Sequence, residues 1–244
     1  MNEYVIFTDS ACDIKPEILK EWGVGFDELT FRFDGEEKSY LNFEMSTGEF
    51  YNKMKGGAVA KTAAINPDTF AASFEKILNE GKDILCIAFS SGLSTTFNSA
   101  RIAAEGLKEK YPERKIIVID TLAASAGEGL LVYLATKKKS EGASIEENAE
   151  YVKSLILKLC HWFTVDDLVY LKRGNTALDG HTHIVTGVTV GNGEHVELVY
   201  LIGIKRELLC TVLRHSGEDK TADVFGGQAL DGARLLFLRG IRFL

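Results

Sequence analysis

Hydrophobic runs of strand length alternate with segments of helical periodicity along the first two thirds of the chain. Three apolar runs predict buried strands, at 4–8 (YVIFT), 83–89 (DILCIAF) and 115–120 (KIIVID). The segment 29–33 alternates apolar and polar residues and predicts a half-buried strand. The intervening segments favour helices, which we expect from Pro16, from Ser46 or Thr47, from Asn66-Pro67, and over 97–110, 124–139 and 145–158. This alternation predicts an α/β fold whose mainly parallel sheet is covered by helices on both faces.

The pattern changes after about residue 175. Glycine and histidine become frequent, and four of the five histidines lie between His181 and His215. Helical periodicity weakens, except over 205–213, where we expect a helix. We therefore predict an N-terminal lobe of residues 1–164 and a smaller α/β lobe of residues 165–244.

Composition excludes several classes of protein. The 244 residues are 45% hydrophobic and 26% charged, which is typical of a globular chain. A net charge of −7 disfavours nucleic acid as a general partner. The chain lacks the stretch of about 20 apolar residues that a transmembrane helix needs, and it lacks a signal-peptide pattern. We expect a cytoplasmic protein that is not an integral membrane protein, with its four cysteines reduced.

Three segments offer hydroxyl groups and backbone amides after predicted strands. They are Thr8-Asp9-Ser10, the segment of Thr62 ahead of the helix from Pro67, and Ser90–Thr96 (SSGLSTT). Hydroxyls and amides at a helix N-terminus favour anions. Because the Walker and dinucleotide patterns are absent and no lysine is placed to reach phosphates, a small anion such as a carboxylate is the more plausible ligand. Ordinary helix capping explains the same residues equally well and stays an alternative.

Catalytic and metal sites find little support in the sequence. Ser91 and Ser94 lack the GxSxG context of a hydrolase nucleophile, and the candidate base His161 lies in an apolar run. His181 and His183 have a spacing that suits one strand face, but no acidic or thiol cluster accompanies them. We expect no catalytic residue, no metal and no cofactor.

Five motifs in order resemble the DegV family of bacterial fatty-acid-binding proteins. They are TDSACDI at 8–14, KTAAINP at 61–67, SSGLSTTFNSA at 90–100, VIDTLAASAGEGLLV at 118–132 and CHWFTVDDLVYLKRG at 160–174. The resemblance covers roughly residues 4–174. It implies a two-lobed α/β fold with a long-chain fatty acid in a buried tunnel between the lobes.

The resemblance also implies a head-group site. The family holds the carboxylate with the Thr of its first loop and the second Ser of its SSGLS loop, which are Thr62 and Ser94 here. The residues that would support the head-group loop are Ser10, Ser91, Gly92 and Thr95. Ala63 stands where the family usually has a serine, so one hydroxyl is missing.

The implied function is that of a carrier. Such proteins present the bound acid to a separate ATP-dependent fatty acid kinase, which forms an acyl phosphate for phospholipid synthesis. Arg173 stands at the expected kinase-docking turn, although a surface charge is an equal alternative. Two other hypotheses stay open. One is a small-molecule kinase subunit or hydrolase that uses the Ser90–Thr96 loop, and the other is a remnant that no longer binds ligand.

The C-terminal part departs from the family pattern. Asn175 and Thr176 follow Gly174 in place of the family's GGR turn, and LIGIK at 201–205 lacks both arginines of the corresponding family segment. The chain is also shorter than is usual in the family. We therefore expect a divergent, shortened C-terminal lobe.

Overall fold

The computed structural model describes residues 3–159, 186–190, 194–204 and 207–212. The chain divides into two compact units, of which the first includes Met1–Leu159 and the second is Cys160–Ile241. The boundary expected between residues 164 and 165 lies outside the described residues, so the proposed extent of the lobes stays a prediction.

A four-stranded parallel sheet forms the centre of the first unit. Its strands lie in the order β2-β1-β6-β7 and are β1 (Tyr4–Asp9), β2 (Gly25–Asp27), β6 (Asp83–Ala88) and β7 (Ile116–Asp120). All six residues of β6 are buried, as a continuous apolar run predicts for an inner parallel strand. The three strands expected from apolar runs are confirmed. The pattern missed β2, because its three half-buried residues, Gly, Phe and Asp, form no apolar run.

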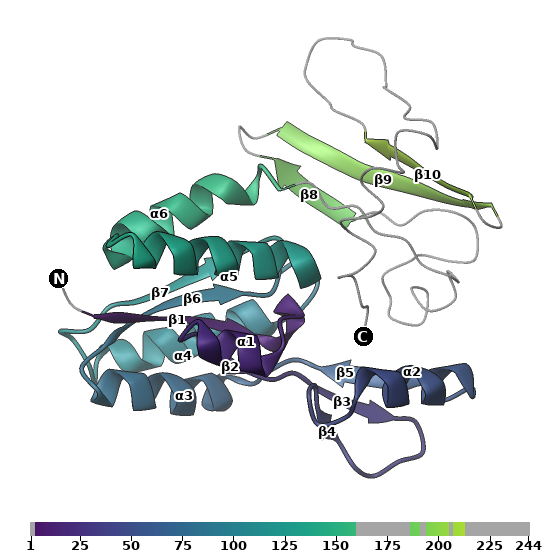
Figure 1. Cartoon of the computed structure of the whole chain (residues 1–244), viewed down its shortest axis with the longest axis horizontal. Coiled ribbons are helices and arrows are strands. Elements are labelled where there is room, and N and C mark those ends of the chain that lie inside the picture. The colour runs from purple at the N-terminus through teal and green to yellow at the C-terminus, as the bar shows by residue number, and fades with distance from the viewer. Residues whose placement is uncertain (1–2, 160–185, 191–193, 205–206, 213–244) are drawn as a thin grey trace. The chain divides into compact units, whose positions relative to one another are not determined.

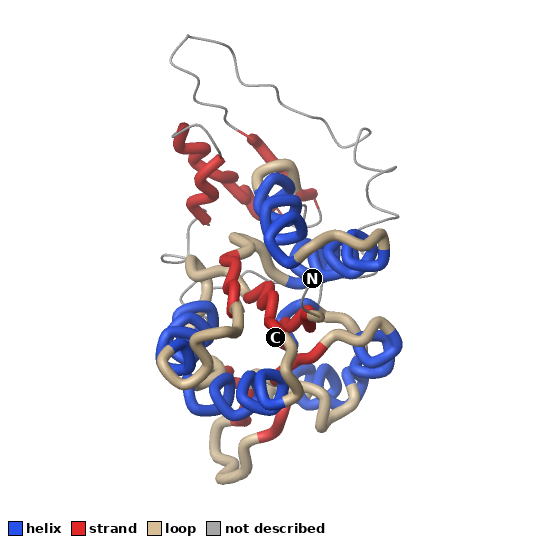
Figure 2. The backbone as a smooth tube through the Cα atoms, turned by 90° about the vertical axis from the view of Figure 1, so that its left-hand side faces the viewer, coloured by secondary structure: helices blue, strands red, loops and turns tan. Residues whose placement is uncertain are grey.

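Helices cover both faces of this sheet. One face carries α1 (Pro16–Glu21), α5 (Ser125–Ser140) and α6 (Ile145–Ile156), and the other carries α3 (Pro67–Asn79) and α4 (Thr96–Lys108) (Figure 1). Alternate residues of β6 serve the two faces: Leu85 and Ile87 join the first core, and Ile84 and Cys86 join the second. Figure 2 shows these helices around the strands from a second direction. The predicted α/β architecture is confirmed.

A small antiparallel sheet with its own core belongs to the same unit. Its order is β4-β3-β5, with β3 (Thr30–Phe33), β4 (Tyr40–Leu41), β5 (Ala60–Ala63) and the adjoining helix α2 (Thr47–Lys55). Phe31, Phe33 and Phe50 are buried together, and the rings of Phe31 and Phe50 meet edge to face at 5.1 Å. The strand expected at 29–33 is thus present, but it pairs outside the parallel sheet.

The second unit contributes a three-stranded antiparallel sheet to the described residues. It has the order β10-β9-β8, with β8 (Thr186–Val190), β9 (Glu194–Ile204) and β10 (Glu207–Val212). The helix expected over 205–213 is wrong, because 207–212 form β10 paired with β9. Leucines and a valine at helical spacing suit a strand equally well when a long neighbouring strand is available.

Candidate functional site

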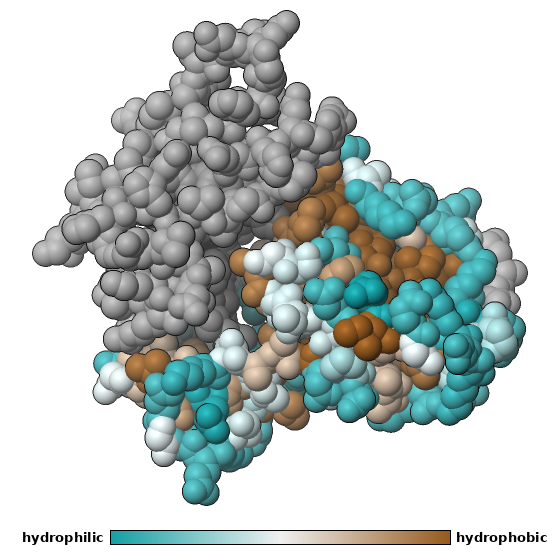
Figure 3. Space-filling model, turned by 180° about the vertical axis from the view of Figure 1, so that it is seen from behind, coloured by the Kyte–Doolittle hydropathy of each residue, from teal (hydrophilic) through white to brown (hydrophobic). Residues whose placement is uncertain are grey.

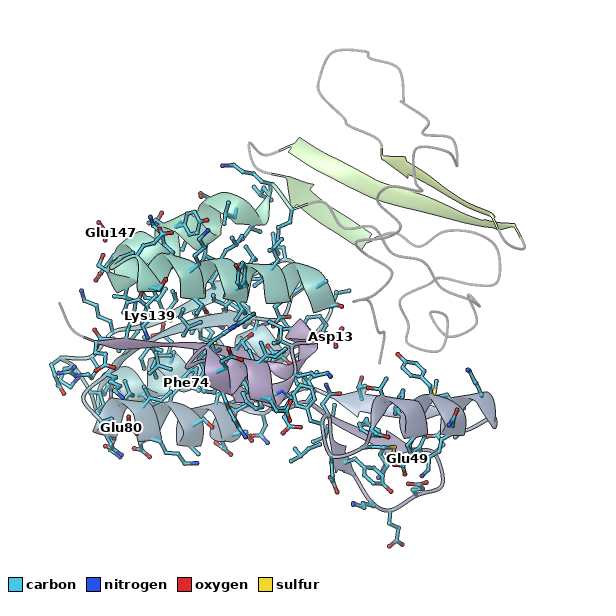
Figure 4. All side chains as sticks on the ribbon, in the orientation of Figure 1. Asp13, Glu49, Phe74, Glu80, Lys139 and Glu147 are labelled. Carbon is cyan, nitrogen blue, oxygen red and sulfur yellow. The ribbon has the colours of Figure 1, made fainter. Side chains whose placement is uncertain are left out.

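The loops that follow β1, β6 and β7 meet at the carboxyl edge of the parallel sheet. Backbone hydrogen bonds join two of them: the Ser90 N–H donates to the Ala123 carbonyl at 3.0 Å. The Thr121 hydroxyl donates to the Ala88 carbonyl at 2.8 Å. Asp13, which follows the short 3₁₀ helix η1 (Ser10–Cys12), points away from the sheet at this edge in Figure 4. Ligands of open parallel sheets bind at such an edge.

The Ser90–Thr96 loop folds into a turn ahead of α4. The N–H groups of Leu93 and Ser94 both donate to the Ser90 carbonyl, at 3.1 and 3.0 Å. The Ser94 Oγ accepts the Thr96 N–H at 3.2 Å and lies 2.9 Å from the Thr96 Oγ1. When Thr96 donates in that second contact, the Ser94 hydroxyl proton stays available for a ligand acceptor. Ser94, just ahead of the N-cap Thr95, thus bonds the first N–H of the helix and keeps the chemistry of an anion donor.

The rest of this loop lies at the surface. Ser91, Gly92 and Thr95 are exposed, and Ser94 is half-buried. Leu93, between the hydroxyl-bearing residues, keeps 45% of its surface exposed. Figure 3 shows apolar surface interspersed with hydrophilic positions on this unit. Polar donors and an apolar side chain are thus offered together to a ligand.

Thr62 lies in strand β5 rather than in a loop, which corrects the sequence expectation. It pairs with Phe31 of β3, and its own side chain is exposed. The helix that follows is capped as expected, since the Asn66 Oδ1 accepts the Thr69 N–H at 2.9 Å. The structure thus gathers Ser91, Gly92, Ser94 and Thr95 in one loop and places Thr62 on the antiparallel sheet.

Thr62 and Ser94 nevertheless precede helices that begin at the same edge. The C-terminal end of α3 leads into β6, and α4 begins after the other end of β6. The two helices pack against each other on one face of the sheet. The positive ends of both helix dipoles therefore lie at this edge of the sheet, and together they favour the binding of an anion there.

Two other predicted site residues have different outcomes. Ser10 is fully buried, and its Oγ accepts the Leu29 N–H at 2.9 Å. That bond ties the first loop to the approach of β3, and a head-group role for Ser10 stays a prediction. Arg173 lies outside the described residues, so kinase docking at that residue also stays a prediction.

The sequence places Asp9 within the first hydroxyl-bearing segment but gives it no role of its own, and it does not single out Asp120. The Asp9 Oδ1 accepts the Ala11 N–H at 3.0 Å, and its Oδ2 accepts the Phe89 N–H at 2.9 Å. The Asp120 Oδ1 accepts the N–H groups of Ser91 and Leu122, at 3.0 and 3.2 Å. The position of each Asp at a strand end beside the hydroxyl loop is the sequence feature that could have identified them.

A second buried acid, Glu128 on α5, lies beneath this edge. Its Oε1 lies 3.1 Å from the Thr8 Oγ1, which is also 2.9 Å from the Ile87 carbonyl. The Thr8 hydroxyl is the donor in both contacts and is shared between the Ile87 carbonyl and the Glu128 carboxyl. Burial raises the pKa of Glu128 well above its ordinary value, and the nearby Asp9 raises it further.

Asp9 is the ionisable partner of this buried pair. Burial raises the pKa of Asp9 from 3.8 to about 6, while its hydrogen bonds from Phe89 and Ala11 oppose that rise. Because two amides donate to the Asp9 carboxylate and no backbone amide of the described residues donates to Glu128, Asp9 is the one that ionises near neutral pH.

Backbone strain is concentrated in the loops of this edge. Three residues other than glycine adopt left-handed conformations in the described part of the chain: Asp13 with φ 55°, Leu122 with φ 50° and Ser125 with φ 52°. Asp13 follows η1, Leu122 lies between β7 and α5, and Ser125 is the first residue of α5. Such conformations cost about 1–3 kcal/mol each and accumulate at functional sites.

Within the described residues, no group of three or more His, Cys, Asp or Glu side chains is placed to hold a metal ion. The helices of that same part of the chain are too short or too polar to cross a membrane.

Residues 3–176 match the family model described as an uncharacterised protein of the DegV family. A DegV domain-containing protein of Clostridium perfringens (strain 13 / Type A) is 43% identical over 175 residues, which are 71% of this chain and 60% of that relative. This chain thus spans about 60% of the length of that relative and of a similar one from Lactococcus lactis.

Solved structures agree with the sequence match. A structure from Thermus thermophilus, described as fatty acid binding of a DegV family protein, aligns with a TM-score of 0.66 at 27% identity. The alignment covers 98% of this chain and 76% of that one. A stearic acid-binding protein from Eubacterium ventriosum aligns with a TM-score of 0.57 at 27% identity, over 62% of this chain and 52% of that one. With a family model matched over more than half of its length, this chain belongs to the DegV family, as its motifs predicted.

Proposed function

We propose that this protein binds a long-chain fatty acid, with the carboxylate near Thr62 and Ser94 and the acyl chain in a buried tunnel. The observation that carries the proposal is the Ser90–Thr96 loop, where hydroxyls, a helix N-terminus and the exposed Leu93 adjoin at the carboxyl edge. The solved relatives described as binding fatty acid or stearic acid support the same ligand class.

The two ends of such a ligand contribute differently to affinity. Each buried methylene is worth about 0.8 kcal/mol, so a long acyl chain supplies most of the binding free energy without a cofactor. Each hydroxyl contact adds about 1 kcal/mol and mainly fixes the orientation of the ligand. Neutral donors also leave the carboxylate charged and nucleophilic, which suits a later phosphorylation.

The protein acts in this proposal as a carrier rather than an enzyme. It presents the acid in the cytoplasm to a separate fatty acid kinase, which forms the acyl phosphate used in phospholipid synthesis, and Arg173 contributes to kinase docking. The alternative of a hydrolase at the Ser90–Thr96 loop has weaker support. Residues 3–159 contain no histidine, so a Ser–His pair would need a base from the other unit.

The binding step is tested first. Native mass spectrometry of gently purified full-length protein is expected to show a bound acyl chain, or uptake of palmitate or oleate after delipidation. Absence of both would refute the proposal.

The head-group site is tested with a double variant. Thr62→Val combined with Ser94→Ala is expected to weaken palmitate binding well over tenfold, because two donors to the carboxylate are lost. The matched control is Thr136→Val combined with Ser154→Ala, whose hydroxyls donate to carbonyls of their own helices, those of Val132 and Tyr151. Equal affinity of the wild type and the Thr62/Ser94 variant would place the head group elsewhere.

A further inference from the structure

The loop between β6 and α4 is held by carboxylates from both neighbouring strands. β1 and β7 flank β6, and each ends in an aspartate, Asp9 and Asp120. Asp9 accepts the Phe89 N–H at 2.9 Å, and Asp120 accepts the Ser91 N–H at 3.0 Å. The two bonded amides lie at the beginning of the segment that carries Ser94.

Each carboxylate also binds the loop of its own strand. Asp9 accepts the Ala11 N–H at 3.0 Å, and Asp120 accepts the Leu122 N–H at 3.2 Å. Each aspartate therefore bridges two loops, one of which is the hydroxyl loop. Hydrogen bonds to ionised acceptors are about twice as strong as those between neutral groups.

Packing alone does little to fix the hydroxyl loop. Ser91, Gly92, Leu93 and Thr95 are exposed. A hydroxyl donor must lie within about 2.5–3.0 Å of its acceptor, so small displacements of the loop remove a contact. The loop's own turn bonds to the Ser90 carbonyl shape it locally, and the directional bonds from the two strand ends tie it to the sheet.

We propose that Asp9 and Asp120 are positioning residues, which clamp the Ser90–Thr96 loop from both sides in the geometry that receives a ligand carboxylate. This inference rests on the proposed fatty-acid function. Neither side chain contacts the ligand, because an aspartate would repel a carboxylate. Both act through the backbone amides of the loop.

The two aspartates differ in a way that makes the proposal testable. Asp9 uses both oxygens, one for each amide, whereas both bonds of Asp120 fall on Oδ1. An asparagine has one acceptor oxygen and two donors on its nitrogen. Asp9→Asn therefore loses one of two bonds and places a donor against an N–H group, while Asp120→Asn can keep both bonds and Asp120→Ala loses both.

The readout must separate head-group positioning from general stability. We would measure the affinities of the full-length protein for palmitate and for 1-hexadecanol, which has the same chain length without the charge, by competition with a fluorescent fatty acid. The palmitate-to-alcohol affinity ratio is expected to fall about tenfold in Asp9→Asn and Asp120→Ala, which corresponds to 1.4 kcal/mol. In Asp120→Asn, unlike Asp120→Ala, the ratio is expected to stay near the wild-type value.

The matched control is Asp83→Asn at the opposite end of β6. Asp83 is also buried, at 1% exposure, and its Oδ1 accepts the Lys115 N–H at 3.1 Å. Its replacement is expected to leave the ratio unchanged. If Asp9→Asn does not fold, the Asp120→Ala and Asp120→Asn pair decides.

Two failures are distinguishable. A wild type that binds no palmitate overturns the proposed function itself. A wild type that binds palmitate, with Asp120→Ala keeping the wild-type ratio, overturns the clamp alone. An equal fall in Asp120→Asn and Asp120→Ala would also overturn it, because Asp120→Asn keeps the oxygen that accepts both amides, so the fall would not come from the loss of those hydrogen bonds.

Discussion

Replacing Asp9 by asparagine is expected to change how the stability of the first unit depends on pH. Asp9 is fully buried, and burial raises its pKa from 3.8 to about 6. Each pKa unit corresponds to about 1.36 kcal/mol, so ionised Asp9 costs the folded state about 3 kcal/mol relative to the protonated form.

The direction of the pKa shift determines whether stability rises or falls with pH. A carboxyl whose folded pKa is raised binds its proton more tightly in the folded state. Its contribution to stability is therefore complete below pH 3.8 and is lost as the pH rises through 6. Between pH 7 and pH 5, the wild type should gain about 1.3 kcal/mol of unfolding free energy relative to Asp9→Asn. The other acidic groups facing this region, Asp27, Glu128 and Asp13, are present in both proteins.

Urea denaturation at pH 5, 6 and 7 measures this difference. Trp22 is a suitable probe, because it packs against the core of the first unit with its ring 5.4 Å from that of Tyr133. A Trp162→Phe background in both proteins removes the second of the two tryptophans. A difference in unfolding free energy that stays constant from pH 5 to 7, or that moves in the opposite direction, would refute the reasoning.

Four further changes test packing and protonation by urea denaturation. Phe74→Ala, at a fully buried position, is expected to cost about 3–5 kcal/mol, and a cost below 1 kcal/mol would contradict the packing described. Gly129→Ala places a Cβ 2.7 Å from the Cys12 carbonyl oxygen and should cost about 1–3 kcal/mol. Gly106→Ala on α4 meets no atom within 4 Å and should instead stabilise by about 0.5–1 kcal/mol. Glu128→Gln should gain stability relative to wild type as the pH rises above 4.5, because the wild-type carboxyl ionises in the unfolded state while burial keeps it protonated in the folded state; an unchanged difference would count against a neutral Glu128.

The main sheet could be predicted because its strands and helices carry their determinants locally. β6 is a continuous apolar run, and the helices α2 and α3 begin where Ser46 and Asn66 accept backbone amides. Thr62 was misplaced for the opposite reason. Its segment AKTA has no strong strand preference, and it becomes β5 through pairing with β3, about 30 positions away in the chain.

The candidate site was predictable only in part. The hydroxyl-rich segment and its family motif identify Ser94 and its neighbours without a structure. Nothing in the sequence around Asp9 and Glu128 distinguishes them from ordinary surface acids. Only the crossing of α5 over β1 buries them together, with the Glu128 side chain against Thr8. Long-range packing of this kind leaves no local pattern.

The place of β1 beside β6 also has a consequence for biosynthesis. Thr8 and Ile87, which share a hydrogen bond, are separated by 79 positions in the chain. At about 5–20 residues per second, the ribosome needs roughly 4–16 s to make that interval. During this time β1 has emerged but lacks its main partner, and an apolar strand with an open edge is prone to pair wrongly. The rate of translation, and not the far faster closure of a chain loop, therefore determines when the first strand becomes protected.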